Sequence, residues 1–118
     1  IFPMTEISRR PWGTYEVIIS CDRYKIKRII VEPGNRLSLQ SHKKRDESWV
    51  IVNGNALIEI GSNSYKLKYG ESIHIKRNEK HRVKNVSDDK LILIEVQTGE
   101  YFGEDDIQRF EDDYNRVK

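Results

Sequence analysis

The sequence predicts an all-β domain, an antiparallel barrel or sandwich, and two observations predict it. Short runs rich in β-branched or aromatic residues fill most of the chain, and several alternate apolar and polar side chains with period two. Turn signals built from Gly, Pro, Asn, Asp and Ser separate the runs at short intervals. Many short strands at regular spacing are typical of these architectures.

The expected strands follow one another from residue 14 to residue 97. In order they cover residues 14–19, 23–32, 36–42, 47–53, 56–60, 64–68, 72–76, 81–86 and 91–97. In the last run, LILIEVQ, the first residues that would point to each of the two faces of the sheet are apolar. We therefore expect a central strand covered on both sides.

The tail, residues 103–118, has a different pattern. Ile107, Phe110 and Tyr114 are spaced i, i+3, i+7, acidic residues open the segment and basic residues close it. An apolar stripe at this spacing, with charges ordered as the helix dipole prefers, predicts a short C-terminal helix packed on the barrel.

Bulk properties narrow the class of protein. A length of 118 residues predicts a single domain, residues 1–118, and a net charge of +2 gives no reason to expect nucleic acid or a membrane as a partner. The single Cys21 excludes an internal disulfide. There is no bilayer-length apolar run and no signal-peptide pattern, so we expect a cytoplasmic protein.

Polar residues interrupt the strands in the stretch SLQSHKKRDESWVIVNG, residues 38–54. Gln40 and His42 share one strand face, and a turn after them can bring Glu47 opposite His42. A later strand can bring His81 to the same place. Two imidazoles, a carboxylate and an amide oxygen suit a borderline divalent ion such as zinc, cobalt, nickel, iron or manganese.

An ordinary half-buried strand is the alternative explanation. Leu37 and Leu39 would then face the core, and Gln40 and His42 would face water. His81 would be structural or exposed under this interpretation, and we assign no site role to His74.

The spacing resembles the first cupin motif, G-x5-H-x-H-x4-E-x6-G. Gly34, Gln40, His42, Glu47 and Gly54 match it, with glutamine in place of the first histidine. The resemblance implies a double-stranded β-helix, or jelly roll, that holds a metal inside.

A second cupin motif, G-x5-P-x-G-x2-H-x3-N, is matched in part. Gly70, His81 and Asn85 fit, whereas Lys76 and Asn78 replace the proline and glycine of the motif.

The stretch QSHKKRDESW, residues 40–49, resembles the Q-x-H-x-x-R-x-E-x-W core of type II phosphomannose isomerases. Residues 9–17, 24–40 and 94–110 also resemble that family. The resemblance implies a metal-dependent isomerase that interconverts mannose 6-phosphate and fructose 6-phosphate and feeds GDP-mannose and polysaccharide synthesis. Such domains are usually fused behind a mannose-1-phosphate guanylyltransferase, which these 118 residues do not include.

The resemblance also implies a site. The metal ligands would be Gln40, His42, Glu47 and His81, binding one divalent ion (zinc, cobalt, manganese or nickel). The general base stays open among a lysine, a metal-bound hydroxide and a non-ligating carboxylate.

Cations are expected to hold the substrate, a sugar phosphate. Arg109 matches the family arginine that faces the substrate, and Lys44 is a further catalytic candidate. Arg10 and Arg45 are weaker candidates for the phosphate. Trp49, like Trp12, either lines the pocket or packs in the core.

Two departures from the family pattern keep a second function open. Lys44 and Ser48 stand where family members commonly have histidine. The alternative is a non-catalytic metal-binding cupin domain that binds a sugar phosphate or nucleotide sugar. We also expect a homodimer, because outward strand positions such as Val50 and Val52 are too apolar to face water unaided.

Overall fold

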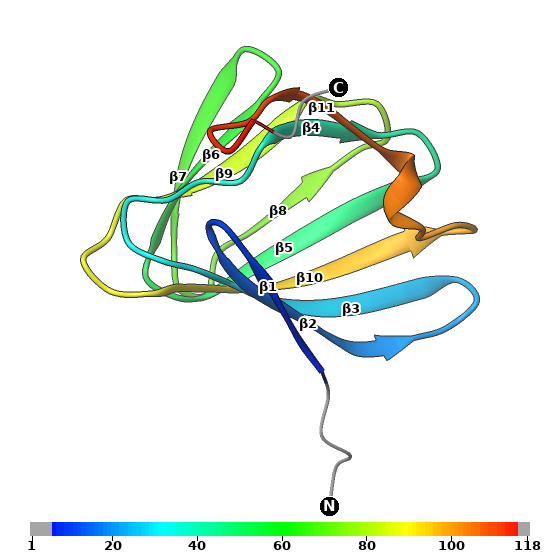
Figure 1. Cartoon of the computed structure of the whole chain (residues 1–118), viewed down its shortest axis with the longest axis horizontal. Coiled ribbons are helices and arrows are strands. Elements are labelled where there is room, and N and C mark those ends of the chain that lie inside the picture. The colour runs from blue at the N-terminus through cyan, green and yellow to red at the C-terminus, as the bar shows by residue number, and fades with distance from the viewer. Residues whose placement is uncertain (1–5, 116–118) are drawn as a thin grey trace, which may run out of the picture.

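The structure, a computed structural model, describes residues 6–115 and is built almost entirely of antiparallel strands (Figure 1). A single 3-10 turn, η1 (Glu104–Asp106), precedes the last of these strands. The strands are β1 (Ile7–Arg10), β2 (Gly13–Ser20), β3 (Tyr24–Val31), β4 (Leu39–His42), β5 (Arg45–Asn53), β6 (Asn55–Ile60), β7 (Asn63–Lys68), β8 (Ser72–Ile75), β9 (His81–Asn85), β10 (Leu91–Gly99) and β11 (Ile107–Glu111).

Two sheets face each other across the core. The six-stranded sheet has the order β1-β2-β3-β10-β5-β8, and the five-stranded sheet has the order β11-β4-β9-β6-β7. Every strand expected from the sequence is present, so the all-β prediction is confirmed. The N-terminal strand β1 was missed because its four residues, ISRR, carry little β signal.

The predicted C-terminal helix is wrong within the described residues. Residues 107–111 form strand β11, which pairs with β4 and places Ile107 opposite His42 and Arg109 opposite Gln40. Pairing with β11 gives hydrogen-bond partners to the backbone groups at the open edge of β4. A short helix in the same place would be only marginally stable by itself. The end of the expected helix, residues 116–118, lies outside the described residues.

The C-terminal segment, residues 103–115, is fastened to the barrel by side chains. Asp106 accepts hydrogen bonds from the backbone N–H groups of Lys43 and Lys44 at 3.2 and 2.9 Å. Arg36 pairs with Asp113 through two 2.8 Å contacts. The Asp106 contacts hold the segment against the turn between β4 and β5, and the Asp113 pair holds it against the loop that precedes β4.

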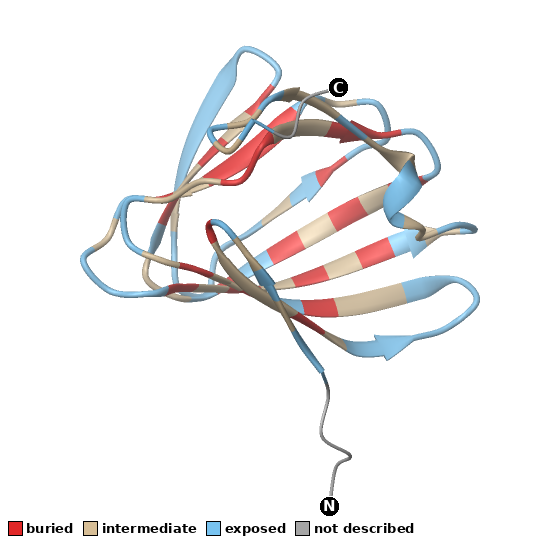
Figure 2. Ribbon diagram, in the orientation of Figure 1, coloured by how far each residue is buried: buried red, intermediate tan, exposed pale blue. Residues whose placement is uncertain are grey.

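The core lies between the inner faces of the two sheets. Its fully or nearly fully buried members are Trp12, Ile29, Val31, Leu37, Trp49, Ile51, Ala56, Ile58, Ile60, Ile75, Val83, Leu91 and Leu93. Buried residues alternate with half-buried or exposed ones along β5 and β10, as the period-two pattern predicts (Figure 2). Strand β10 is central, as expected, but its outer residues Ile92, Ile94 and Val96 are only half-buried.

The inner face of the six-stranded sheet changes chemistry along its strands. On β5 the inward positions run from Arg45 and Glu47 to Trp49 and Ile51. On β10 the order is reversed, and the antiparallel register sets Gln97 beside Glu47. One end of the barrel is therefore an apolar core, and the other end is a buried polar site.

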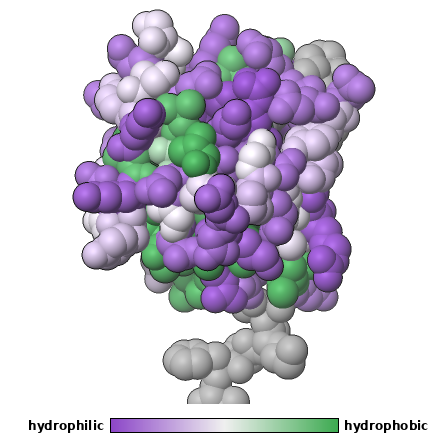
Figure 3. Space-filling model, turned by 90° about the vertical axis from the view of Figure 1, so that its left-hand side faces the viewer, coloured by the Kyte–Doolittle hydropathy of each residue, from purple (hydrophilic) through white to green (hydrophobic). Residues whose placement is uncertain are grey.

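The surface is mostly hydrophilic on the face shown in Figure 3, with small groups of hydrophobic side chains. Val50 and Val52, both on the outer face of β5, are 38% and 50% exposed. Among the described residues, no helix is long and apolar enough to cross a membrane.

We predict that the chain forms a homodimer through the outer face of β5. Val52→Lys should shift it toward monomer, because burying a lysine in an apolar contact costs several kcal/mol. Val86→Lys is the matched control, since Val86 is 47% exposed but lies outside the strands. Light scattering at micromolar concentration checks this, and a monomeric wild type would refute it.

Candidate metal site

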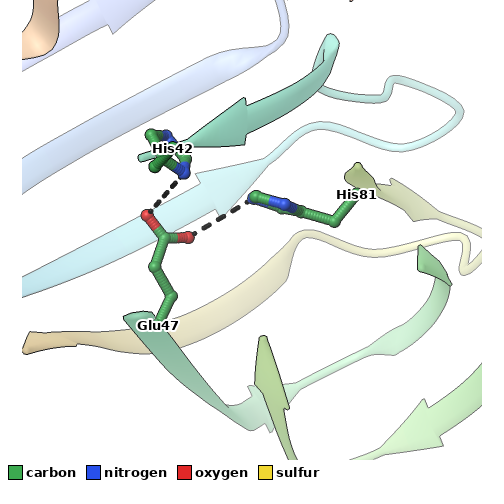
Figure 4. Close-up of side chains that lie close together, drawn as sticks. All are labelled: His42, Glu47 and His81. Carbon is green, nitrogen blue, oxygen red and sulfur yellow. Dashed lines mark ion pairs between the residues drawn. The ribbon is translucent and has the colours of Figure 1, made fainter. Parts of the chain in front are cut away.

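Three buried side chains from three strands meet at the polar end of the barrel (Figure 4). His42 lies on β4, Glu47 on β5 and His81 on β9, and each is at most 3% exposed. His42 Nδ1 lies 3.5 Å from Glu47 Oε2, and His81 Nε2 lies 3.6 Å from Glu47 Oε1. One ligand atom from each residue lies within 4.8 Å of the others.

Backbone pairing explains why these residues converge. The turn at Lys43 and Lys44 reverses the chain, so β5 returns with Glu47 on its inner face. Strand β9 pairs with β4, where His81 lies directly opposite Gln40. The convergence expected for His42, Glu47 and His81 is thus present, and the ordinary-strand alternative fails because His42 faces inward.

The histidines are oriented as ligands would be. His81 Nδ1 lies 2.9 Å from the backbone carbonyl of Glu79. As a donor to that oxygen, Nδ1 leaves the Nε2 lone pair directed into the site. Neither His42 Nε2 nor His81 Nε2 has a hydrogen-bond partner among the described residues. Buried polar atoms without partners are rare in folded proteins, so both nitrogens are open to a ligand such as a metal ion.

The donor set fits a divalent ion. Ligand atoms each about 2.1 Å from one ion are roughly 3.0–3.5 Å apart, close to the separations seen here. Separations of 3.5 and 3.6 Å are too long for good hydrogen bonds. The geometry therefore fits a divalent ion held between the three side chains, and their role as ligands stays a prediction.

Burial and neighbouring charges shift the protonation of all three residues. Burial lowers the pKa of His42 to about 4, so its imidazole is neutral at neutral pH, the form that binds metals. Burial alone would raise the pKa of Glu47, but His81, His42 and Arg45 together hold it below its usual value. Burial opposes protonation of His81, yet the facing Glu47 raises its pKa. A metal ion binds the neutral form of each imidazole, so protonation of His81 would compete with metal binding.

Gln40 and Asn85 are the remaining polar residues of the two motifs. Gln40 lines the same cavity, on the strand face that carries His42; its role as a ligand stays a prediction. Asn85 is fully buried and donates to the carbonyls of Val31 and Asp89 at 2.8 Å. Asn85 therefore fixes the loop between β9 and β10 and has no contact with the site.

The site opens into a cavity with an empty volume of about 500 Å³, part of it open to solvent. Cationic residues on its wall come from different strands. They are Arg10, Lys27, Arg45 and Arg109. Arg45 is 3% exposed and its Nε donates to Glu47 Oε2 at 3.1 Å.

Arg109 lies on the cavity wall, as the sequence predicts, although the predicted helix does not exist. On strand β11, Ile107 and Arg109 share a face, and both line the cavity. The helical pattern would have placed Arg109 opposite the apolar stripe, in solvent. The strand instead places Arg109 on the wall of the cavity.

The two tryptophans have different places. Trp12 lines the cavity and also belongs to the core. Trp49 is 1% exposed, is not among the lining residues, and donates from Nε1 to Glu95 Oε2 at 3.0 Å. The structure thus supports core packing for Trp49 in place of the expected contact with substrate.

Lys44 and Ser48 both lie outside the cavity. Lys44 is exposed, and its ammonium group lies 4.7 Å from the centre of the Tyr101 ring. Ser48 faces outward on β5, with its Oγ 2.9 Å from His74 Nδ1. The geometry argues against the expected catalytic role for Lys44, and the two missing family histidines leave the cavity lining unchanged.

Sequence reasoning missed Lys27, Glu95, Gln97 and Glu104, which line the cavity. Lys27, Glu95 and Gln97 are charged or polar residues that interrupt the inward face of β3 and β10, where Ile29, Val31, Leu91 and Leu93 are apolar. That interruption is the signal that could have found them. Burial, followed by the charge of Glu47, raises the pKa of Glu95 to about 7.

The family model for the mannose-6-phosphate isomerase C-terminal domain matches residues 4–112. The chain belongs to this family. It is 48% identical over 108 residues to the xanthan biosynthesis protein XanB of Xanthomonas campestris, and 46% identical over 108 residues to the mannose-1-phosphate guanylyltransferase ManC of Salmonella typhimurium. Each match covers 92% of this chain but only 23% and 22% of those relatives. This domain of the isomerase family thus spans less than a quarter of their length.

Solved structures support the cupin fold. The capsular polysaccharide assembling protein CapF of Staphylococcus aureus superposes with a TM-score of 0.83 at 19% identity, over 92% of this chain and 33% of that one. The Cnp3 cupin domain of Schizosaccharomyces pombe superposes with a TM-score of 0.71 at 11% identity, over 73% and 60% of the two chains. At such identities these likenesses show the fold alone.

We predict that protein purified without chelator holds one divalent ion, and that His42→Ala lowers its occupancy about tenfold or more at limiting metal. His74→Ala is the matched control, because His74 is exposed and outside the cavity. Elemental analysis of the three proteins checks this. Equal metal content in wild type and His42→Ala would refute the ligand assignment.

A second prediction concerns pH. The pKa of Glu95 is raised from 4.5 to about 7 in the folded state, so folding favours its protonated form. Its contribution to stability is present below pH 4.5 and is lost as pH rises through about 7. In metal-free protein, Glu95→Gln should become more stable relative to wild type over this range, by about 1–3 kcal/mol.

Urea unfolding of metal-free wild type and Glu95→Gln at pH 5, 6, 7 and 8 checks this. Glu100→Gln is the control, because Glu100 is an exposed residue. Parallel stability curves for wild type and Glu95→Gln would contradict a raised pKa for Glu95.

Proposed function

We propose that the domain is a metal-dependent isomerase that interconverts mannose 6-phosphate and fructose 6-phosphate. The observation that carries the proposal is the convergence of His42, Glu47 and His81 at the base of a cavity whose wall bears several cations. Membership of the mannose-6-phosphate isomerase C-terminal family supports this substrate. The names of relatives, such as xanthan biosynthesis protein, favour a place in the supply of GDP-mannose for polysaccharide synthesis.

The reaction moves a proton between C1 and C2 of the open-chain sugar through an enediol. A bound divalent ion would act as a Lewis acid, stabilising the negative charge that develops on the sugar oxygen. His42, Glu47 and His81 would hold that ion, with Gln40 as the proposed fourth ligand. These nitrogen and oxygen ligands suit zinc, cobalt, manganese and nickel alike.

The cationic residues of the wall have a separate task. A phosphate is best held by guanidinium groups, which offer several N–H donors in a fixed plane. Arg109 reaches the cavity from β11 and Arg10 from β1, the two outer strands on this side of the barrel. Holding the phosphate fixes C1 and C2 relative to the reacting groups.

Removing Arg109 should weaken catalysis far more than metal binding. Loss of one charge-assisted phosphate contact predicts a ten- to hundredfold lower kcat/KM, about 1.5–3 kcal/mol, for Arg109→Ala. Arg109→Lys should recover only part of the activity, because an ammonium keeps the charge but loses the planar donors. Arg9→Ala is the matched control, because Arg9 is exposed and lies outside the cavity.

Steady-state kinetics on mannose 6-phosphate, with metal content measured in parallel, checks this proposal. The wild type is assayed with zinc, cobalt, manganese and magnesium. If wild type binds the sugar phosphate but isomerises it with none of these metals, the domain is a non-catalytic binding domain.

A further inference from the structure

Two buried cations face the same carboxylate oxygen at the edge of the cavity. Lys27 Nζ lies 3.7 Å and Arg45 Nη2 lies 3.9 Å from Oε2 of Glu104. The side chains of Lys27 and Arg45 are only 6% and 2% exposed, whereas that of Glu104 is 46% exposed. Two fixed cations thus converge on a point that a half-exposed carboxylate occupies.

The contacts to Glu104 are loose. Both distances exceed the length of a good hydrogen bond, so the carboxylate neutralises the two cations without satisfying their donors. Glu104 belongs to the 3-10 turn η1, where no side chain caps the backbone and none of its three residues is buried. A carboxylate held in this way can leave at little cost.

The cations, in contrast, are held in place. The Lys27 ammonium lies 4.5 Å from the centre of the Tyr15 ring, and Arg10 lies over the same ring at 4.9 Å. Arg45 is fixed by burial and by the 3.1 Å hydrogen bond that its Nε donates to Glu47 Oε2. Rigid donors facing a cavity bind an anion with little loss of side-chain entropy.

The local charge favours an anion. The inward side chain two residues before Lys27 is Lys25, and burial followed by the charge of Lys27 lowers its pKa. Glu104 opposes that shift. Removal of Glu104 from this corner therefore leaves an excess of positive charge that an incoming anion would neutralise.

We propose that the space between Lys27 and Arg45 is the phosphate subsite of this cavity, and that Glu104 occupies it until a phosphate displaces it. This inference rests on the proposed function for the substrate, but it concerns anion binding alone. A phosphate monoester carries up to two negative charges and three acceptor oxygens, so it bonds both cations where one carboxylate reaches neither closely. Arg109 and Arg10 line the same cavity.

The test is calorimetric titration of the zinc-loaded full chain with mannose 6-phosphate, mannose and inorganic phosphate. Lys27→Met, which keeps the length of the side chain, should weaken mannose 6-phosphate and phosphate binding about ten- to hundredfold and leave mannose unchanged. Lys27→Arg should retain most of the affinity. Lys68→Met is the matched control, because Lys68 is exposed on β7 outside the cavity.

Glu104→Gln tests the displacement. It removes the competing charge and keeps the shape, so phosphate binding should become about two- to fivefold tighter. Glu100→Gln, also exposed, should have no effect. Unchanged or weaker phosphate binding by Glu104→Gln would overturn the displacement, and full phosphate affinity in Lys27→Met would overturn the subsite.

Failure of the inference is separable from failure of the proposed function. If wild type binds mannose 6-phosphate more tightly than mannose in a Lys27-dependent way but does not isomerise it, the subsite stands and the isomerase proposal falls. If wild type isomerises the sugar but Lys27→Met changes neither KM nor phosphate inhibition, the subsite is refuted and the isomerase proposal stands. A wild type that binds neither phosphate ligand overturns the subsite.

Discussion

The buried charge of Glu47 is the constraint on which the polar end of the barrel depends. Removing a carboxylate from water costs several kcal/mol unless nearby positive groups compensate. Arg45 lies 3.1 Å away on the same strand, and His42 and His81 approach from the opposite sheet at 3.5 and 3.6 Å. The same contacts therefore hold the two sheets together at this end and keep Glu47 ionised, the form in which a carboxylate can bind a metal ion. A divalent ion added to Glu47 and Arg45 would leave the site positive, which favours an anionic substrate.

Neighbouring core residues fix the position of the side chains around Glu47. Trp49 links the two halves of the barrel, because its ring packs edge-on against His81 at 5.6 Å and its Nε1 donates to Glu95. Glu95 in turn accepts a 2.6 Å hydrogen bond from Gln97. Polar groups in a water-poor interior are stabilising only when they are paired. The members of this network must therefore be placed as accurately as the apolar side chains packed beside them. Burial of apolar side chains at one end stabilises the fold, and this offsets the desolvation cost of the charged groups buried at the other end.

The sequence was sufficient for most of the fold and for the convergence of His42, Glu47 and His81, and the reasons are local. Period-two alternation marks half-buried strands directly, and His42 and Glu47 are close in sequence, so one turn brings them together. The C-terminal strand was not predictable in this way. Ile107, Phe110 and Tyr114 fit a helix by spacing alone, and only the unpaired edge of β4 decides for a strand. Lys27 was missed for a similar reason, since its place in the cavity depends on pairing of β3 with β10, far along the chain.

The C-terminal segment has two functions that follow from its being a strand. As β11 it covers the edge of β4 and brings Arg109 to the cavity; through η1 it sets Glu104 against Lys27 and Arg45. Asp106, between these two, binds the backbone of Lys43 and Lys44, the turn that positions His42 and Glu47. The candidate metal ligands and the cations of the wall are thus contacted by one short stretch of chain. A helix at the same place would have left the β4 edge open and Arg109 in solvent, so the strand pairing itself assembles the site.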